Sequence, residues 1–225
     1  MADTEINSNI FDQIAQCTDI KSVTSEGTGS FGRLPDGSYL CSTEKAEFYY
    51  GKNNDKFMVK LTLKCVEDGI STEYDSMGNP VKAIVKGSKN RLFYKYYNFT
   101  NENQYKSFVS DMMKYKDGLI EMLNSNLEYF DILKNDETIS KFLNLNANST
   151  VDDIKDDTVF RNFFKSKYIC EYFLAYISNL TVWVQLTTRL KKGLPANSEM
   201  TEDNTDQWTS LLSWKRAIAL GLEGE

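Results

Sequence analysis

Five Phe or Tyr residues occur among the nine residues RLFYKYYNF, which begin at position 91. Such a composition favours a β-strand, and the side chains of a strand alternate between its two faces. Phe93, Tyr97 and Phe99 would then share one face, and Tyr94 and Tyr96 the other. We expect the first three to belong to the core, which leaves two tyrosine rings on the face that should meet solvent.

Other predicted strands mix aromatic rings and cations on their polar faces in the same way. Aromatic rings can stack on bases, at about 1 to 3 kcal/mol per base, and cations neutralise phosphates. The pattern predicts a site for single-stranded nucleic acid that reads no sequence, formed by Lys60, Lys64, Arg91, Tyr94, Lys95, Tyr96, Trp183, Arg189, Lys191, Trp214 and Lys215. The alternative is that Tyr94, Tyr96 and Trp183 are core residues of a sheet that is covered on both faces.

A basic stretch leads into this aromatic segment. Between Lys82 and Lys95 the chain carries five cations and no acidic residue. A solvated loop is one interpretation of this stretch, and an arm that follows the phosphates is the other.

Catalytic and metal-binding patterns are weak. The chain has no histidine, which excludes Ser-His-Asp, Cys-His and H-E-x-x-H sites. The four cysteines are scattered and form no C-x-x-C pair, so no zinc site is predicted. Acidic residues at 152–157 suit the first turn of a helix, and a metal-dependent nuclease that uses them ranks third among the possible functions. We therefore predict no enzyme activity, no metal and no cofactor.

The distribution of charge matters more than its sum. The formal net charge is -6, which alone argues against a nucleic-acid partner. Residues 33–99 nevertheless carry 11 basic and 8 acidic residues, whereas residues 100–178 carry 9 basic and 13 acidic ones. Residues 1–32 carry one basic and five acidic residues. The negative charge is thus concentrated outside the predicted strands.

The periodicity of apolar residues divides the chain into strand-like and helix-like parts. Alternation is clearest in KFMVKLTLKCV, which begins at position 56. We predict two strong helices within 100–178, one at 100–126 and one at 150–178, a short helix near 137–145, and a long loop at 67–80. Residues 1–32 are predicted to form a short helix and a linker, and residues 33–225 a single domain. The predicted strands are 38–50, 56–66, 91–99, 180–190 and 207–216.

One segment resembles a known family. Residues 34–69 resemble the opening of a bacteriophage protein family that is associated with single-stranded-DNA binding in replication and recombination modules. The matching positions are Pro35, Gly37, Tyr39, Glu44 to Glu47, Met58 and the pair Asp68 and Gly69. The resemblance implies an OB-like fold and single-stranded DNA as the partner.

Together these observations predict an α+β protein with a mainly β core. The expected fold is a five-stranded OB-like barrel with a large helical insertion at about 100–178, between strands 3 and 4. The expected function is sequence-tolerant binding of single-stranded DNA in phage DNA replication or recombination. Phage replication or recombination proteins are the expected further partners. The alternative is a structural or protein-interaction subunit of a phage that docks through its helices. No apolar run is long enough to span a membrane, and the acidic, polar first residues do not suit a secretory signal, so we expect the host cytoplasm.

Overall fold

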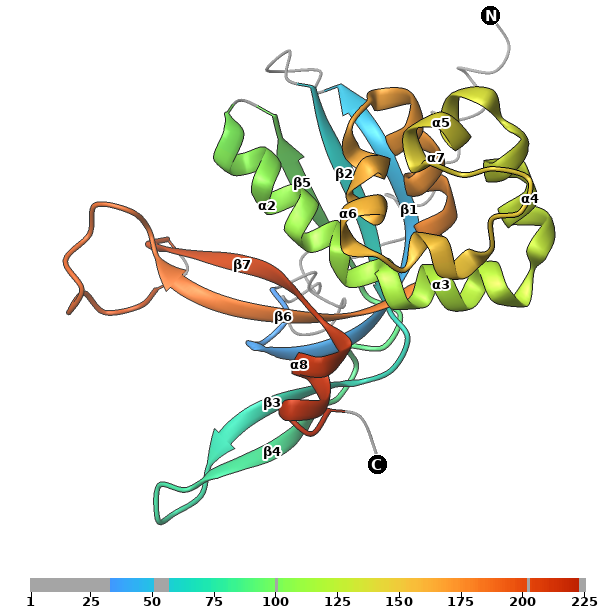
Figure 1. Ribbon diagram of the computed structural model, residues 1–225. Coiled ribbons are helices and arrows are strands. Elements are labelled where there is room, and N and C mark those ends of the chain that lie inside the picture. The colour runs from blue at the N-terminus through green and yellow to red at the C-terminus, as the bar shows by residue number, and fades with distance from the viewer. Residues whose placement is uncertain (1–32, 51–56, 100, 202, 223–225) are drawn as a thin grey trace, which may run out of the picture. The chain divides into compact units, whose positions relative to one another are not determined.

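The computed structural model describes residues 33–50, 57–99, 101–201 and 203–222. The compact unit Pro35–Glu225 combines an antiparallel, open sheet with helices that lie between β5 (Leu92–Asn98) and β6 (Thr181–Leu190) along the chain (Figure 1). The α+β class that we predicted is therefore confirmed. The helix and linker predicted within 1–32 lie outside the described residues.

The long strand β1 organises the sheet. β1 (Gly37–Tyr50) pairs with β2 (Phe57–Cys65) through residues 41–50, and with β6 (Thr181–Leu190) through residues 37–42. β5 (Leu92–Asn98) adds to the free edge of β2, and β7 (Thr205–Leu212) adds to β6. All five predicted strands are thus present. β5 and β7 share no strand pairing, so the sheet stays open rather than closing into a barrel.

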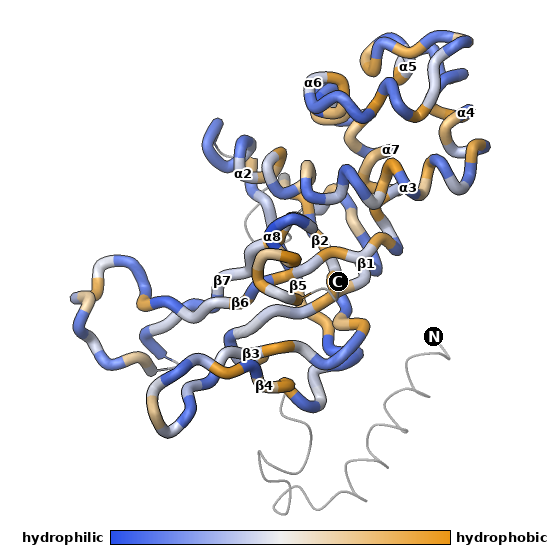
Figure 2. The backbone as a smooth tube through the Cα atoms, turned by 60° about the horizontal axis from the view of Figure 1, so that its bottom comes forward, coloured by the Kyte–Doolittle hydropathy of each residue, from blue (hydrophilic) through white to orange (hydrophobic). Residues whose placement is uncertain are grey.

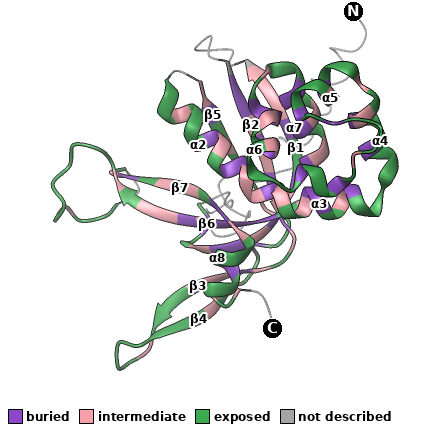
Figure 3. Cartoon of the chain, viewed as in Figure 1, coloured by how far each residue is buried: buried purple, intermediate pink, exposed green. Residues whose placement is uncertain are grey.

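A hairpin replaces the loop predicted at 67–80. β3 (Gly69–Tyr74) pairs with β4 (Pro80–Val85), and Figure 3 shows much of this hairpin exposed. The Asp75 carboxylate holds its turn by accepting hydrogen bonds from the backbone N–H groups of Met77 and Asn79, at 2.9 and 2.8 Å. Gly78 supplies the positive φ of +80°. The loop prediction was wrong because its polar, exposed residues hid the strand pattern.

The helices between β5 and β6 are shorter than predicted. The first predicted helix is divided by a 3-10 turn, and the second, at 150–178, is wrong as a continuous helix because Asp156 and Ser166 each cap a new one. Figure 2 shows hydrophobic and hydrophilic residues mixed along these segments, as expected of helices with one buried side. They are α2 (Glu102–Met112), η1 (Met113–Tyr115), α3 (Lys116–Ser125), α4 (Leu127–Asn135), α5 (Glu137–Leu143), η2 (Val151–Ile154), α6 (Asp157–Phe160), η3 (Arg161–Phe164) and α7 (Lys167–Ile177).

Polar contacts join these helices to one face of the sheet. The hydroxyls of Thr43 on β1 and Tyr115 in η1 hydrogen-bond at 2.8 Å, and both side chains are buried. Lys114 donates to the backbone carbonyl of Leu211 on β7 at 2.6 Å. The apolar core lies between this face and the helices, so the opposite face of β2 and β5 is the one left open to solvent.

The end of the last predicted strand is a helix instead. β7 stops at Leu212, and α8 (Trp214–Ala219) follows, with the Ser213 hydroxyl accepting from the backbone N–H of Arg216 at 3.2 Å. α8 brings Ala217 onto Trp183 and Leu212, and all three are buried.

Within the residues described, no helix is both long and apolar enough to cross a membrane.

Candidate nucleic-acid interface

The aromatic residues of β5 are sorted between the two faces of the sheet. Tyr97 is only 5% exposed, and its ring meets the edge of Phe108 with centroids 5.3 Å apart. Tyr94 and Tyr96 point the other way, and each is 48% exposed. The interpretation of these two tyrosines as core residues is therefore wrong, and their rings are open to a ligand.

Tyr94 and Tyr96 gather with a third tyrosine around one lysine. The pairing of β2 with β5 sets Lys60 opposite Tyr96 and Thr62 opposite Tyr94. The Lys60 ammonium lies 4.5 Å from the centroid of the Tyr94 ring, 5.5 Å from that of Tyr49 and 6.0 Å from that of Tyr96. We call Tyr49, Lys60, Tyr94 and Tyr96 the tyrosine face. Its neighbouring ring centroids are 6.3 and 6.5 Å apart.

Lys60 keeps its charge available for a ligand. Its close contacts are ring faces, which attract cations without neutralising them, and it makes no ion pair within the described part of the chain. Glu47 stands opposite Lys60 in the pairing of β1 with β2 but bonds to Lys45 at 2.6 Å. The tyrosine face thus offers aromatic surface and one positive charge together.

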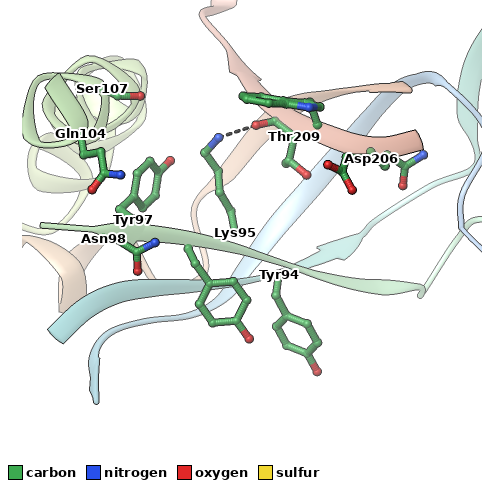
Figure 4. Close-up of a pocket in the computed structure, with 11 residues that line it drawn as sticks. Tyr94, Lys95, Tyr97, Asn98, Gln104, Ser107, Asp206 and Thr209 are labelled. Carbon is green, nitrogen blue, oxygen red and sulfur yellow. Dashed lines mark hydrogen bonds between the residues drawn. The ribbon is translucent and has the colours of Figure 1, made fainter. Parts of the chain in front are cut away.

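Lys95, which we predicted to contact DNA, is not part of the tyrosine face. It lies on the same side of β5 as Tyr97, as Figure 4 shows, and forms an ion pair with Asp111 at 3.2 Å. Its ammonium also donates to the backbone carbonyl of Thr209 on β7. Lys95 therefore ties β5 to β7 and is occupied by internal partners.

The edges of β5 and β7 enclose a cleft. Its volume is about 430 Å³, and Tyr94, Lys95 and Asp206 are among its lining residues (Figure 4). Trp208 also lines it, is 55% exposed, and lies with its ring centroid 5.5 Å from the Arg189 guanidinium. The cleft thus adds a second exposed ring with a cation beside it.

Two tryptophans that we predicted to bind DNA lie away from the tyrosine face. Trp183 is 3% exposed because α8 covers it, so it cannot stack on a base. Trp214 is half exposed, but it lines a different cavity together with the acidic residues Asp117 and Glu121, which disfavour a phosphate. Lys215 follows on α8, exposed and apart from the tyrosine face.

The remaining predicted cations lie on different elements of the chain. Lys64 is on the same face of β2 as Lys60, opposite Leu92. Arg91 directly precedes β5 and accepts, through its backbone carbonyl, a hydrogen bond from Cys65 at 3.0 Å. Lys191 holds the loop after β6, because its ammonium donates to the backbone carbonyl of Asp203 at 2.7 Å.

Sequence reasoning missed Tyr49 and Trp208. The alternation of side chains within its strand could have identified Trp208. The position of Tyr49 beside Tyr96, however, depends on how β1, β2 and β5 pair. A bulge between Thr43 and Lys45 shifts that pairing by one residue, which changes the face to which the later residues of β1 point. No spacing in the sequence indicates this bulge.

The raised pKa of Tyr97 reflects a structural role and does not indicate catalysis. Burial, and then the Asp111 carboxylate, raise the pKa of Tyr97 well above its usual value, so its hydroxyl stays protonated and donates to Asp111 at 2.9 Å. In the described ranges no three Cys, Asp or Glu side chains gather in a way that could hold a metal ion.

Comparisons of the chain with models of protein families, with curated proteins and with solved structures find no match. Functional inference therefore rests on the geometry of the tyrosine face and of the cleft beside it.

Proposed function

We propose that the protein binds single-stranded DNA by stacking bases on the tyrosine face. The observation that carries this proposal is the exposure of Tyr94 and Tyr96 around Lys60, on the side of the sheet opposite the helices. Stacking uses the flat face that every base has, and Lys60 attracts a phosphate wherever the strand is placed. Such binding tolerates any sequence.

The cleft beside β5 extends the proposed interface. A strand that leaves the tyrosine face over the edge of β5 meets Trp208 on β7, with Arg189 beside its ring. Both groups are of the kinds that single-stranded DNA uses, a stacking surface and a phosphate partner. Lys64 continues the positive charge along β2 in the other direction.

The strand order supports the interpretation of the sheet as an open OB-like barrel. β1, β2 and β5 are adjacent antiparallel strands, a helical segment follows, and β6 and β7 then add to the other edge of β1. β5 and β7, whose pairing would close the barrel, are linked by the hydrogen bond from Lys95 to Thr209. In OB-folds the second and third strands form the binding face, which here corresponds to β2 and β5.

The proposed setting is phage DNA replication or recombination in the host cytoplasm, without catalysis by this chain. It is supported by the resemblance of residues 34–69 to the phage family and by the excess of basic residues in 33–99.

A titration with oligo-dT and with duplex DNA of the same length tests this function. We expect the fluorescence of Trp208 to change on binding of oligo-dT, and the affinity for oligo-dT to exceed that for duplex. The affinity should fall with salt, with a log-log slope of about -0.7 for each phosphate neutralised. Equal affinity for the two, or no binding of either, would reject the proposal.

A protein-interaction subunit is the second candidate, favoured by apolar side chains that α4 leaves in solvent. Leu127 and Ile132 are 60% and 48% exposed, and a partner could cover such side chains. Failure to bind oligo-dT in the titration would favour this candidate.

A further inference from the structure

A further cavity lies on the helical side of the sheet, where β1 and β5 end beside α2 and α7. Its volume is about 340 Å³, within the range of ligand pockets. The buried residues Phe108, Phe164 and Cys170 line it. Phe48, Phe99 and Tyr105 line it as well and are only partly covered. The cavity is therefore an aromatic pocket that is reached from solvent.

The rings of this pocket are held in fixed positions. Phe99 and Phe164 each meet the ring of Phe108 edge to face, with centroids 5.3 and 5.8 Å apart. The Tyr105 hydroxyl donates to the backbone carbonyl of Phe164 at 2.5 Å, which fixes the ring at the rim. An aromatic guest would find ring edges and faces already arranged for such contacts.

Positive charge marks the rim of the pocket. Lys165 and Lys167 both line it, whereas no Asp or Glu does so among the described residues. The Lys167 ammonium lies 5.5 Å from the centroid of the Phe48 ring and pairs with Glu171 at 3.3 Å. Lys165 makes no ion pair in the part of the chain that the structure describes. Because Glu171 offsets the charge of Lys167, Lys165 gives the rim its net positive charge, which complements an anionic ligand.

The pocket is separate from the tyrosine face. Phe48 precedes Tyr49 on β1, so their side chains point to opposite faces of the sheet. Phe99 follows β5 and contacts Phe108 of α2, on the helical side. A DNA strand that lies on the tyrosine face would have to pass around the sheet to enter. The geometry therefore favours a ligand other than the bound DNA.

We propose that this pocket docks an acidic segment of a partner protein, with an aromatic side chain of that segment inserted among Phe48, Phe99 and Phe164. Carboxylates beside the inserted ring would meet Lys165 and Lys167. The contact leaves the tyrosine face open, so partner and DNA bind at the same time.

The probe for this site is a fluorescein-labelled peptide of sequence Glu-Asp-Phe-Asp-Glu, followed by fluorescence anisotropy. We expect replacement of its Phe by Ala to abolish binding. The protein variant Lys165→Gln/Lys167→Gln should bind the peptide about tenfold more weakly, as expected when two partly exposed ion pairs are lost. Lys141→Gln, which removes an exposed lysine of α5, is the matched control and should bind normally.

A neutral peptide, Gln-Asn-Phe-Asn-Gln, separates charge from packing, because its weaker affinity should be the same for the wild type and the double lysine variant. Oligo-dT binding provides the independent readout and should be unchanged in that variant. The proposal is overturned if the acidic peptide does not bind, or if the lysine substitutions leave its affinity unchanged. Displacement of the peptide by oligo-dT would instead assign the pocket to the DNA.

Discussion

Lys60 is the residue that turns three neighbouring tyrosines into a possible ligand surface. Its ammonium lies within 6.0 Å of three ring centroids, so the rings surround a charge that a phosphate can share. Asp111 has the opposite character on the other side of β5. It is buried and binds Tyr97, Lys95 and Lys114, which commits those groups to the fold. The two faces of β5 thus separate the residues that we propose to bind DNA from structural ones.

Substitution of single tyrosines on β5 should separate these two roles. Tyr96→Ala should weaken oligo-dT binding by about 1 to 3 kcal/mol and change stability little, because the ring is half exposed. Tyr97→Ala should cost about 3 to 5 kcal/mol of folding stability, as removal of a buried ring does. Urea unfolding and DNA titration of both variants provide the measurements. Equal destabilisation by the two substitutions would place Tyr96 in the core.

At the scale of elements, two glycines should respond to alanine in opposite directions. A Cβ on Gly69, where β3 begins, would lie 2.2 Å from atoms of the buried Tyr39 ring. Gly69→Ala should therefore destabilise the protein by about 1 to 3 kcal/mol. A Cβ on Gly118 in α3 would meet only Leu180, at 3.9 Å, so Gly118→Ala should stabilise by about 0.5 to 1 kcal/mol. Unfolding midpoints with the same sign for both would contradict this packing.

Two aspartates that cap helices should make the folding stability fall at low pH. Hydrogen bonds from the backbone N–H of Ile139 and of Val159 lower the pKa of Asp136 and of Asp156, respectively. Because these pKa values are lower in the folded state, the stabilisation is complete above the unfolded value and is lost as pH falls through the folded one. Thermal unfolding should thus occur at lower temperature below about pH 4.

The double variant Asp136→Asn/Asp156→Asn is the control for this pH dependence. It retains capping groups that do not titrate, so its unfolding temperature should vary less between pH 7 and pH 3 than that of the wild type. An identical profile in the two proteins would exclude the caps as the cause.

The sequence predicted the elements better than their ends and connections. Alternation located all five predicted strands, since a half-buried strand must alternate. It did not reveal the break at Ser166 within the second predicted helix, where apolar residues continue but a capping hydroxyl starts a new helix. Trp183 alternated as a polar-face residue, yet α8 covers it, and that packing depends on Ala217, far along the chain. The alternation of polar and apolar residues predicts which face of the sheet a residue occupies. It does not predict which element covers that face.

At the scale of the whole unit Pro35–Glu225, the sheet separates two surfaces. Helices cover one face and surround the aromatic pocket, while the tyrosine face occupies the other. This arrangement would let the protein hold DNA and a protein partner on different sides. It would also reconcile the acidic net charge with the proposed binding of DNA, since the helical residues 100–178 carry more acidic than basic residues whereas 33–99 carry more basic ones.

Photocrosslinking locates the DNA most directly. Oligo-dT that contains 5-iododeoxyuridine would be irradiated with the full chain, and the linked residues identified by mass spectrometry. We expect links to Tyr94, Tyr96 or Tyr49, a weaker link to Trp208, and loss of the first group in the Tyr94→Ala/Tyr96→Ala variant. Links confined to the exposed Tyr129 and Tyr168 of the helices, with none on β5, would contradict the assignment of the tyrosine face as the DNA-binding surface.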